Sequence, residues 1–264
     1  GATAAIDAIV TPGDSPASIT IGANTQFSAT VNGISYLWVT SESTSLTKQS
    51  NGAFTGTLDI VEGTPLQHRF TVNTTTPVRY ILPNENTDTT SFTIRIQEST
   101  ANSSTTTYTL VSDLSTVDST STVYYIQENE DNLYEVYFGD GVFGKKPING
   151  NIVIIDYRVV SGTAVNGANT FATPASLGGY STFTTTTSSV AQGGALQETI
   201  ESIKFNAPFK FQSQDRLVTM QDYKNIILTE NGDLSSINVW GGEDNDPPIY
   251  GKVFVAAKPT SGSL

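Results

Sequence analysis

The sequence predicts a mainly β, multi-domain protein with a smaller α+β part at its C-terminal end. Short runs of alternating apolar and β-branched residues, separated by turn residues, fill most of the first 160 positions. Apolar residues with helical spacing appear only after Gly193 and Gly194. With 264 residues, of which 37% are hydrophobic, the chain can bury a real core. We therefore expect antiparallel sheets or a sandwich, followed by two helices and two strands.

Composition argues against several classes of function. The net charge is -12 with only 13 Lys and Arg residues, so nucleic acid is not an expected partner. The absence of cysteine excludes disulfides, thiolate metal sites and cysteine nucleophiles. No apolar run approaches the roughly 18 residues that a membrane span requires. We expect no cofactor, no membrane association and no small-molecule substrate, and we take the chain, which begins with Gly1, to be part of a longer protein.

The first segment, residues 1–62, is predicted to contribute to a small antiparallel sheet. Asn32 and Gly33 form a dipeptide typical of tight hairpins, and they lie between two alternating runs. The strand-like runs of this segment are 6–10, 18–21, 26–31, 36–39 and 58–61.

Three aromatic residues flank that hairpin. Phe27, Tyr36 and Trp38 are interpreted as core and cross-strand packing partners. An exposed platform for sugars is the alternative, and with Trp240 it supports a second hypothesis, a carbohydrate-binding or adhesin module.

A second β domain is predicted over residues 63–175. The single histidine, His68, has no neighbouring cluster of ligands and is expected to have a packing or surface role. The acidic run 128–132 lacks the ligand order of a calcium loop and is interpreted as a hairpin turn. The strand-like runs of this domain are 69–72, 78–82, 91–97, 106–111, 123–127, 134–138 and 151–160.

The last two of these runs are joined by a glycine-rich loop and are predicted to pair. Gly139, Gly141 and Gly144 would allow positive φ or close backbone approach, while Asp140 would accept backbone N–H groups. A phosphate-binding loop is excluded because a strand, not a helix, follows the glycines. Two aromatic residues, Phe138 and Phe143, are expected to anchor the loop in the core, and Gly150 closes it.

A third hypothesis is a glycoside hydrolase that uses two carboxylates, Glu135 and Asp140. It is disfavoured because residues so placed on a strand and a turn have no predictable separation across a cleft.

Residues 176–194 are predicted to be an extended connector with some sheet character, in which 180–185 could still form a strand, and the Ser, Thr and Gly-rich passage 173–194 is the candidate hinge. An α+β domain is expected over 195–264. Its first helix is predicted over 195–206 and should stop at Ala207 and Pro208.

A second helix is predicted from Met220 to Glu230. Thr219 and Asp222 have the spacing of a capping box, with Tyr223 facing inward and the helix ending near residues 231–232. Two strands, 235–240 and 252–258, should close the domain. The loop between them is a candidate interface because it mixes acids with apolar side chains, namely Trp240, Pro247, Pro248, Ile249 and Tyr250.

Two blocks of residues resemble the baseplate J-like family of contractile-tailed phages, in particular the C-terminal part of the wedge proteins of T-even myophages. The first block is Phe138-Gly139-Asp140-Gly141, followed by Gly144 and Gly150. The second comprises Ala207-Pro208, Asp215-Arg216, Val218-Thr219 and Asp222-Tyr223. The likeness covers residues 134–258, whereas residues 1–130 share only β character.

The resemblance implies a structural protein rather than an enzyme. It implies assembly, in the host cytoplasm, into the ring around the tail hub of the virion baseplate. The expected partners are further copies of the chain, as a homodimer or higher oligomer, and other baseplate wedge proteins. A part in the rearrangement that triggers sheath contraction is also implied.

Overall fold

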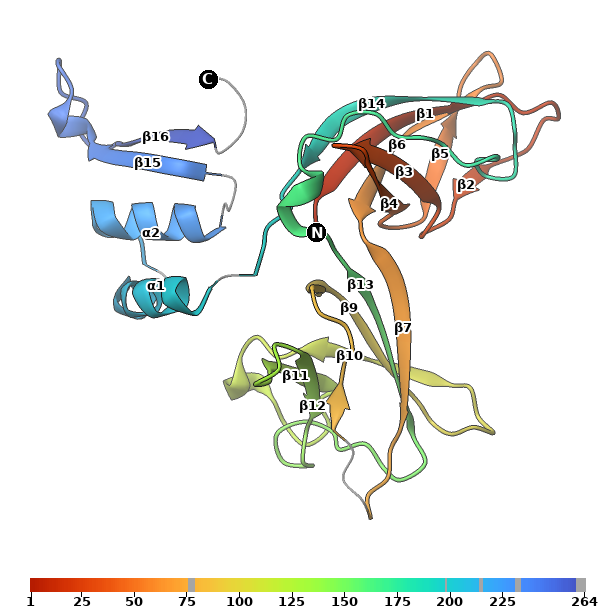
Figure 1. Ribbon diagram of the computed structural model, residues 1–264, viewed down its shortest axis with the longest axis horizontal. Coiled ribbons are helices and arrows are strands. Elements are labelled where there is room, and N and C mark those ends of the chain that lie inside the picture. Colours follow the sequence, from red (N-terminus) through yellow and green to blue (C-terminus); the bar gives the residue numbers. More distant parts are fainter. Residues whose placement is uncertain (76–78, 198, 214–215, 231–233, 260–264) are drawn as a thin grey trace.

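The computed structural model describes residues 1–75, 79–197, 199–213, 216–230 and 234–259. Within these ranges the chain forms two seven-stranded sheets, a two-stranded sheet and two α-helices, which confirms the predicted mainly β class. Figure 1 shows the two large sheets as separate bodies, with the helices and the small sheet to one side. Three short 3-10 helices lie in the connections, at Leu114–Thr116, Gly162–Val165 and Gly242–Asp244.

The first sheet follows the predicted alternation. In β1 every second side chain is buried, and β1 pairs with β6 along its whole length. Asn32 and Gly33 have φ of 51° and 81° and close the predicted β3–β4 hairpin. Its order is β14-β1-β6-β4-β3, with β2 and β5 attached through β6, and its strands are β1 (Thr3–Val10), β2 (Ile19–Ile21), β3 (Gln26–Val31), β4 (Ile34–Thr40), β5 (Thr44–Lys48), β6 (Phe54–Glu62) and β14 (Phe183–Gln192).

The aromatic residues of the hairpin belong to the core of this sheet. Trp38 is 0% exposed, and its ring meets that of Phe171 edge to face at 5.1 Å. Phe27 is also buried and Tyr36 is half-buried against the same core. Core packing is therefore confirmed, and the alternative of a sugar platform built on Trp38 is wrong.

The predicted connector, residues 176–194, contains an integral strand. β14 pairs with β1 from Val10↔Phe183 to Thr3↔Gln192, because its Thr, Ser and Val residues suit a strand at the edge of a sheet. Val165 and Phe171, which were assigned to the second β domain, and Leu177 of the connector also enter the core of the first sheet. The chain thus leaves the first sheet after β6 and returns to it after β13. A hinge within residues 183–192 is not compatible with this pairing.

The second sheet is a curled sheet with its own core. Its order is β7-β13-β9-β10-β11-β12-β8, and the core includes Ile94, Tyr108, Val136 and Ile155. His68 is half-buried against Phe70, which agrees with the predicted packing role. The strands are β7 (Thr64–Thr71), β8 (Tyr80–Ile81), β9 (Thr87–Gln97), β10 (Thr105–Leu110), β11 (Val123–Glu128), β12 (Tyr134–Phe138) and β13 (Ile152–Val159).

The predicted pairing of the two strands that flank the glycine-rich loop is wrong. β12 pairs with β11 and β8, whereas β13 pairs with β7 and β9. The first half of β13 is apolar on both faces, with Val153, Ile154 and Ile155 all buried, which suits a strand between two long neighbours. The loop therefore spans the sheet instead of closing a hairpin, and the hairpin of this region is β11–β12, across the acidic run 128–132.

The C-terminal unit consists of α1 (Ile200–Ser213), α2 (Met220–Glu230), β15 (Leu234–Gly241) and β16 (Val253–Pro259). Helix α2 and both strands lie where the sequence predicts them. Helix α1 begins and ends later than predicted, and Pro208 lies inside it. Proline removes one helical hydrogen bond, but Pro208 is exposed, so water can satisfy the carbonyl that its missing N–H leaves free.

The C-terminal unit is a stack of three layers. Helix α1 packs on α2, and α2 packs on β15 of the two-stranded sheet, as Figure 1 also shows. Of the hydrophobic side chains that the structure describes between 195 and 259, Val239 alone is buried. None of the described helices is long and apolar enough to span a membrane.

Candidate assembly site

The glycine-rich turn after β12 is built on close backbone contact. A Cβ on Gly139 would lie 2.1 Å from the carbonyl oxygen of Gly144, a distance that no side chain tolerates. Gly141 and Gly144 have φ of 98° and 96°, and the Gly141 N–H donates to the Gly144 carbonyl at 3.1 Å. Gly150, with φ of 88°, allows the chain to turn into β13. Each of these glycines therefore has a conformational or steric reason to be glycine.

Asp140 makes the hydrogen bonds that the sequence predicts for it. Its Oδ1 accepts the backbone N–H groups of Val142 at 2.8 Å and Phe143 at 3.0 Å. These bonds stabilise the carboxylate and hold the pKa of Asp140 below its usual value. The Asp140 side chain thus stabilises the backbone conformation of the turn.

The two aromatic anchors predicted for this turn behave differently. Phe138 packs against the core, with its ring edge to face against those of Tyr80 and Tyr108. Phe143 is 56% exposed, so the prediction that it anchors the turn is wrong. The bonds to Asp140 fix the Phe143 backbone without a buried side chain.

An ion pair with a buried carboxylate and an exposed guanidinium lies next to this turn. Glu135 on β12 is 1% exposed, and Arg79 donates to both of its oxygens, Nε to Oε1 at 2.8 Å and Nη2 to Oε2 at 2.5 Å. These bonds lower the pKa of Glu135 although burial opposes the change. Sequence reasoning missed this pair because the two residues are 56 positions apart and meet only through strand pairing.

The glycosidase hypothesis fails on the surroundings of its two carboxylates. A general acid requires a raised pKa, whereas the pKa values of Glu135 and Asp140 are both lowered. Both oxygens of Glu135 are occupied by Arg79. Among the described residues, no group of three or more His, Cys, Asp and Glu side chains is placed to hold a metal ion.

Charged side chains lie where the first sheet meets the second. Glu62 and Asp88 are buried, and both oxygens of Glu62 accept the Ser161 N–H at 3.1 Å. Burial lowers the pKa of Arg158, and the charges of Asp88 and Glu62 oppose that change. The ends of β6, β9 and β13 therefore bring two carboxylates and one guanidinium close enough for their charges to interact.

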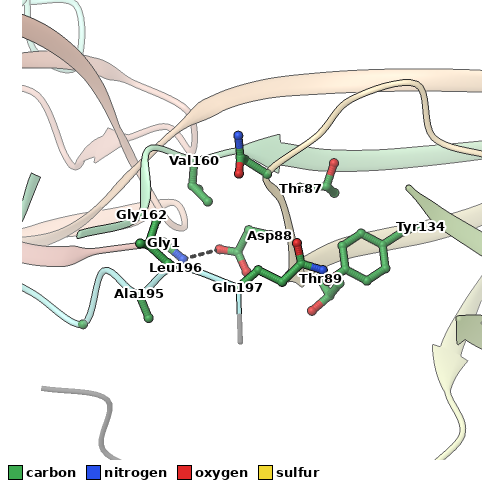
Figure 2. Close-up of a pocket in the computed structure, with 12 residues that line it drawn as sticks. Gly1, Thr87, Asp88, Thr89, Tyr134, Val160, Gly162, Ala195, Leu196 and Gln197 are labelled. Atoms are coloured by element: carbon green, nitrogen blue, oxygen red, sulfur yellow. Dashed lines mark hydrogen bonds and ion pairs between the residues drawn. The ribbon is translucent and has the colours of Figure 1, made fainter. Parts of the chain in front are cut away.

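A cavity of about 220 Å³ lies beside this cluster. Figure 2 shows Asp88 next to Gly1, with Leu196 and Gln197 close by. Asp88 Oδ1 accepts the hydroxyl of Thr90 at 2.6 Å. The start of the chain, the second sheet and the segment leading to α1 meet here.

The second block of motif residues lies on the surface of the C-terminal unit. The capping box is formed: Thr219 Oγ1 accepts the Asp222 N–H at 3.2 Å, and Asp222 Oδ2 accepts the Thr219 N–H at 2.8 Å. Tyr223 is half-buried, as expected for an inward-facing residue. Ala207, Pro208 and Arg216 are exposed, whereas Asp215 and residues 231–232 lie outside the described ranges.

The predicted interface loop between β15 and β16 has a fixed base and an exposed tip. The Trp240 ring stacks on Phe254 at 5.8 Å, and its Nε1 donates to Asn245 Oδ1 at 3.1 Å. At the tip, Pro247 and Pro248 are exposed, Ile249 is 41% exposed and Tyr250 is 79% exposed. Their exposure is compatible with an interface, which stays a prediction.

Exposed apolar side chains are concentrated in the C-terminal unit and the segment leading to it. Phe211 is 81% exposed and Val218 is 76% exposed. A surface of this kind is typical of protein contacts in an assembly. The set also includes Leu196, Ile200, Ile203, Leu217, Met220, Leu228, Val253 and Val255.

Comparison with known proteins points to the same region. Residues 219–264 match the family model of the baseplate structural protein gp6, C-terminal domain I. The chain is similar to a phage baseplate protein. Over 160 residues it is 28% identical to the baseplate wedge protein gp6 of Enterobacteria phage T4, a match that covers 52% of this chain and 24% of that protein.

These similarities support a structural role in a phage baseplate, and that role does not require enzymatic activity. The chain spans about a quarter of the length of the T4 relative that it matches. Neither match is to the baseplate J-like family, so that finer resemblance stays a prediction.

Proposed function

We propose that this chain is part of a structural subunit of a contractile-tail baseplate wedge. In the virion it would contact further copies of itself and other wedge proteins in the ring around the tail hub. The exposed apolar surface of the C-terminal unit carries the proposal, because the part of the chain that resembles gp6 domain I, residues 219–264, contributes to this surface through Met220, Leu228, Val253 and Val255.

The subunit would take part in the rearrangement that accompanies sheath contraction by moving as stiff bodies. Both large sheets have buried cores, and packed cores switch between discrete arrangements rather than stretch. Because β14 is paired along the first sheet, movement would occur between bodies and not within residues 183–192.

Sedimentation of the full-length protein, alone and mixed with the other wedge proteins of its phage, tests the proposal. We expect a defined homo-oligomer or a complex, with an interface of at least about 1,000 Å². A full-length protein that stays monomeric and binds no tail protein would contradict it. The carbohydrate-binding alternative loses support, because Trp38, which was to stack on sugar rings, is buried.

A further inference from the structure

A pocket of about 400 Å³ lies where β12 enters the glycine-rich turn. The turn contributes one wall and the end of β7 another, while the edge strand β8 and the ion pair of Arg79 with Glu135 complete it. The lining includes Val72, Tyr80, Val136, Tyr137, Phe138, Gly139, Lys146 and Pro147.

The charge of this pocket is opposite to that of the chain. Two cationic side chains, Arg79 and Lys146, and one anionic side chain, Glu135, are among its lining residues, whereas the chain has a net charge of -12. The Arg79 side chain is 64% exposed although it pairs with Glu135. A guanidinium has five N–H donors, and the Glu135 oxygens take two of them. An incoming carboxylate can therefore be bound without breaking the ion pair.

The other walls are apolar. Val72, Phe138 and Pro147 offer surface for an aliphatic or aromatic side chain. A matching ligand would present acidic groups next to a bulky apolar group on a short, exposed segment.

The loop between β15 and β16 has this chemistry. It presents three acids, Glu243, Asp244 and Asp246, together with the exposed side chains of Ile249 and Tyr250. In Figure 1 the loop lies at the upper left of the view, away from β12 of the second sheet at the lower centre. We therefore consider the loop of a second chain as the occupant of the pocket.

We propose that the pocket beside the glycine-rich turn binds the acidic β15–β16 loop of a second copy of this chain. Such a contact is heterologous, because it joins two different surfaces, and its repetition produces a ring or an open chain of copies. The inference rests on the proposed function, since it specifies one of the self-contacts that a baseplate ring would need. It also gives the turn a binding role in addition to its role in the fold.

Disulfide trapping tests the contact directly. The chain has no cysteine, so single cysteines can be introduced without background. One sample carries Lys146→Cys in the pocket and the other Tyr250→Cys in the loop. When they are mixed under oxidising conditions, we expect a crosslinked heterodimer several times more abundant than with Lys145→Cys. Lys145 is also exposed but is not among the lining residues, so it is the matched control.

If Lys146→Cys gives no more crosslinked heterodimer than Lys145→Cys, the inference is overturned. A predominance of Tyr250→Cys homodimers would also overturn it, because it would place two loops together in a two-fold contact. In both cases sedimentation still reports on self-association, so the proposed baseplate role can stand when this contact fails.

A charge exchange provides the second test. Lys146→Glu and Asp246→Lys should each reduce self-association of the chain in sedimentation, and mixing the two variants should restore it. Since both side chains are exposed, neither change should disturb folding, which circular dichroism checks. Reduced association in both variants without recovery in the mixture would contradict a direct contact between pocket and loop.

Discussion

The two large sheets and the C-terminal unit differ in how completely they bury their apolar side chains. Each sheet encloses a continuous core, with Trp38 and Leu58 fully buried in the first and Ile94 and Ile155 in the second. The C-terminal unit, in the part that the structure describes, buries one hydrophobic side chain, Val239. The two sheets therefore have cores of their own, whereas the described apolar side chains of the C-terminal unit are largely exposed and can contact other chains.

Substitution of the two tryptophans compares the stability that burial gives the first sheet with that in the C-terminal unit. Trp38→Ala should destabilise the first sheet by about 3–5 kcal/mol, because it empties a filled core. Trp240→Ala should cost about 1–2 kcal/mol, since the half-buried ring loses mainly its stacking on Phe254 and one hydrogen bond. Denaturant unfolding of both variants measures the difference. Equal losses would mean that the C-terminal unit has a complete core.

The glycine-rich turn allows a second paired test. Gly139→Val should destabilise the second sheet by about 3 kcal/mol or more, because its side chain would overlap the Gly144 carbonyl. Gly141→Ala should cost about 1–2 kcal/mol, since the position has open space and only its φ of 98° is unfavourable. Thermal unfolding ranks the two. A Gly139→Val variant that folds normally would disprove the close contact.

The ion pair of the buried Glu135 with Arg79 makes stability depend on pH, and the direction of this dependence can be reversed by a substitution. The folded-state pKa of Glu135 is lowered, so its stabilisation is complete above the unfolded pKa of about 4.3 and is lost as the pH falls through the lower folded value. In Arg79→Met the burial of Glu135 would instead raise its pKa above the unfolded value. That variant should therefore lose stability as the pH rises through the raised pKa.

Thermal unfolding of the wild type and Arg79→Met between pH 3 and pH 8 measures this reversal. Thr107→Val, an exposed change on strand β10 of the same sheet, is the control and should keep the wild-type profile. Parallel profiles for all three proteins would show that Arg79 does not set the charge state of Glu135.

The smallest effect is expected at the capping box. Thr219→Ala removes the oxygen that accepts the Asp222 N–H and should lower stability by about 1 kcal/mol. Thr219→Ser keeps that oxygen and should have little effect. Hydrogen exchange of the first turn of α2 detects the change, and equal exchange in both variants would rule out a capping role.

Local patterns predicted the elements well. The alternation in 26–31 and 134–138 and the capping box at Thr219 gave the bounds of β3, β12 and α2, because neighbouring residues determine these features. Strand β5 was missed because Leu46 is its one buried residue. The end of helix α1 was predicted before Pro208 because proline usually ends a helix. The structure continues through Pro208, which is exposed.

Long-range features could not be predicted in the same way. The pairing of β14 with β1 joins residues nearly 180 positions apart, and no short pattern encodes it. The same holds for the separation of β12 from β13 and for the meeting of Arg79 with Glu135. The pocket therefore became visible only when the sheet order was known, although the turn beside it was recognisable from its glycines.

The central claim is that the C-terminal unit completes its burial through contacts with other chains. Sedimentation velocity of the 264-residue chain and of its Phe211→Ser variant tests this most directly, because Phe211 is 81% exposed and its loss should not disturb the fold. We predict concentration-dependent association for the wild type and a clear loss of association for the variant. Identical sedimentation of both proteins as monomers, at all concentrations, would contradict the account.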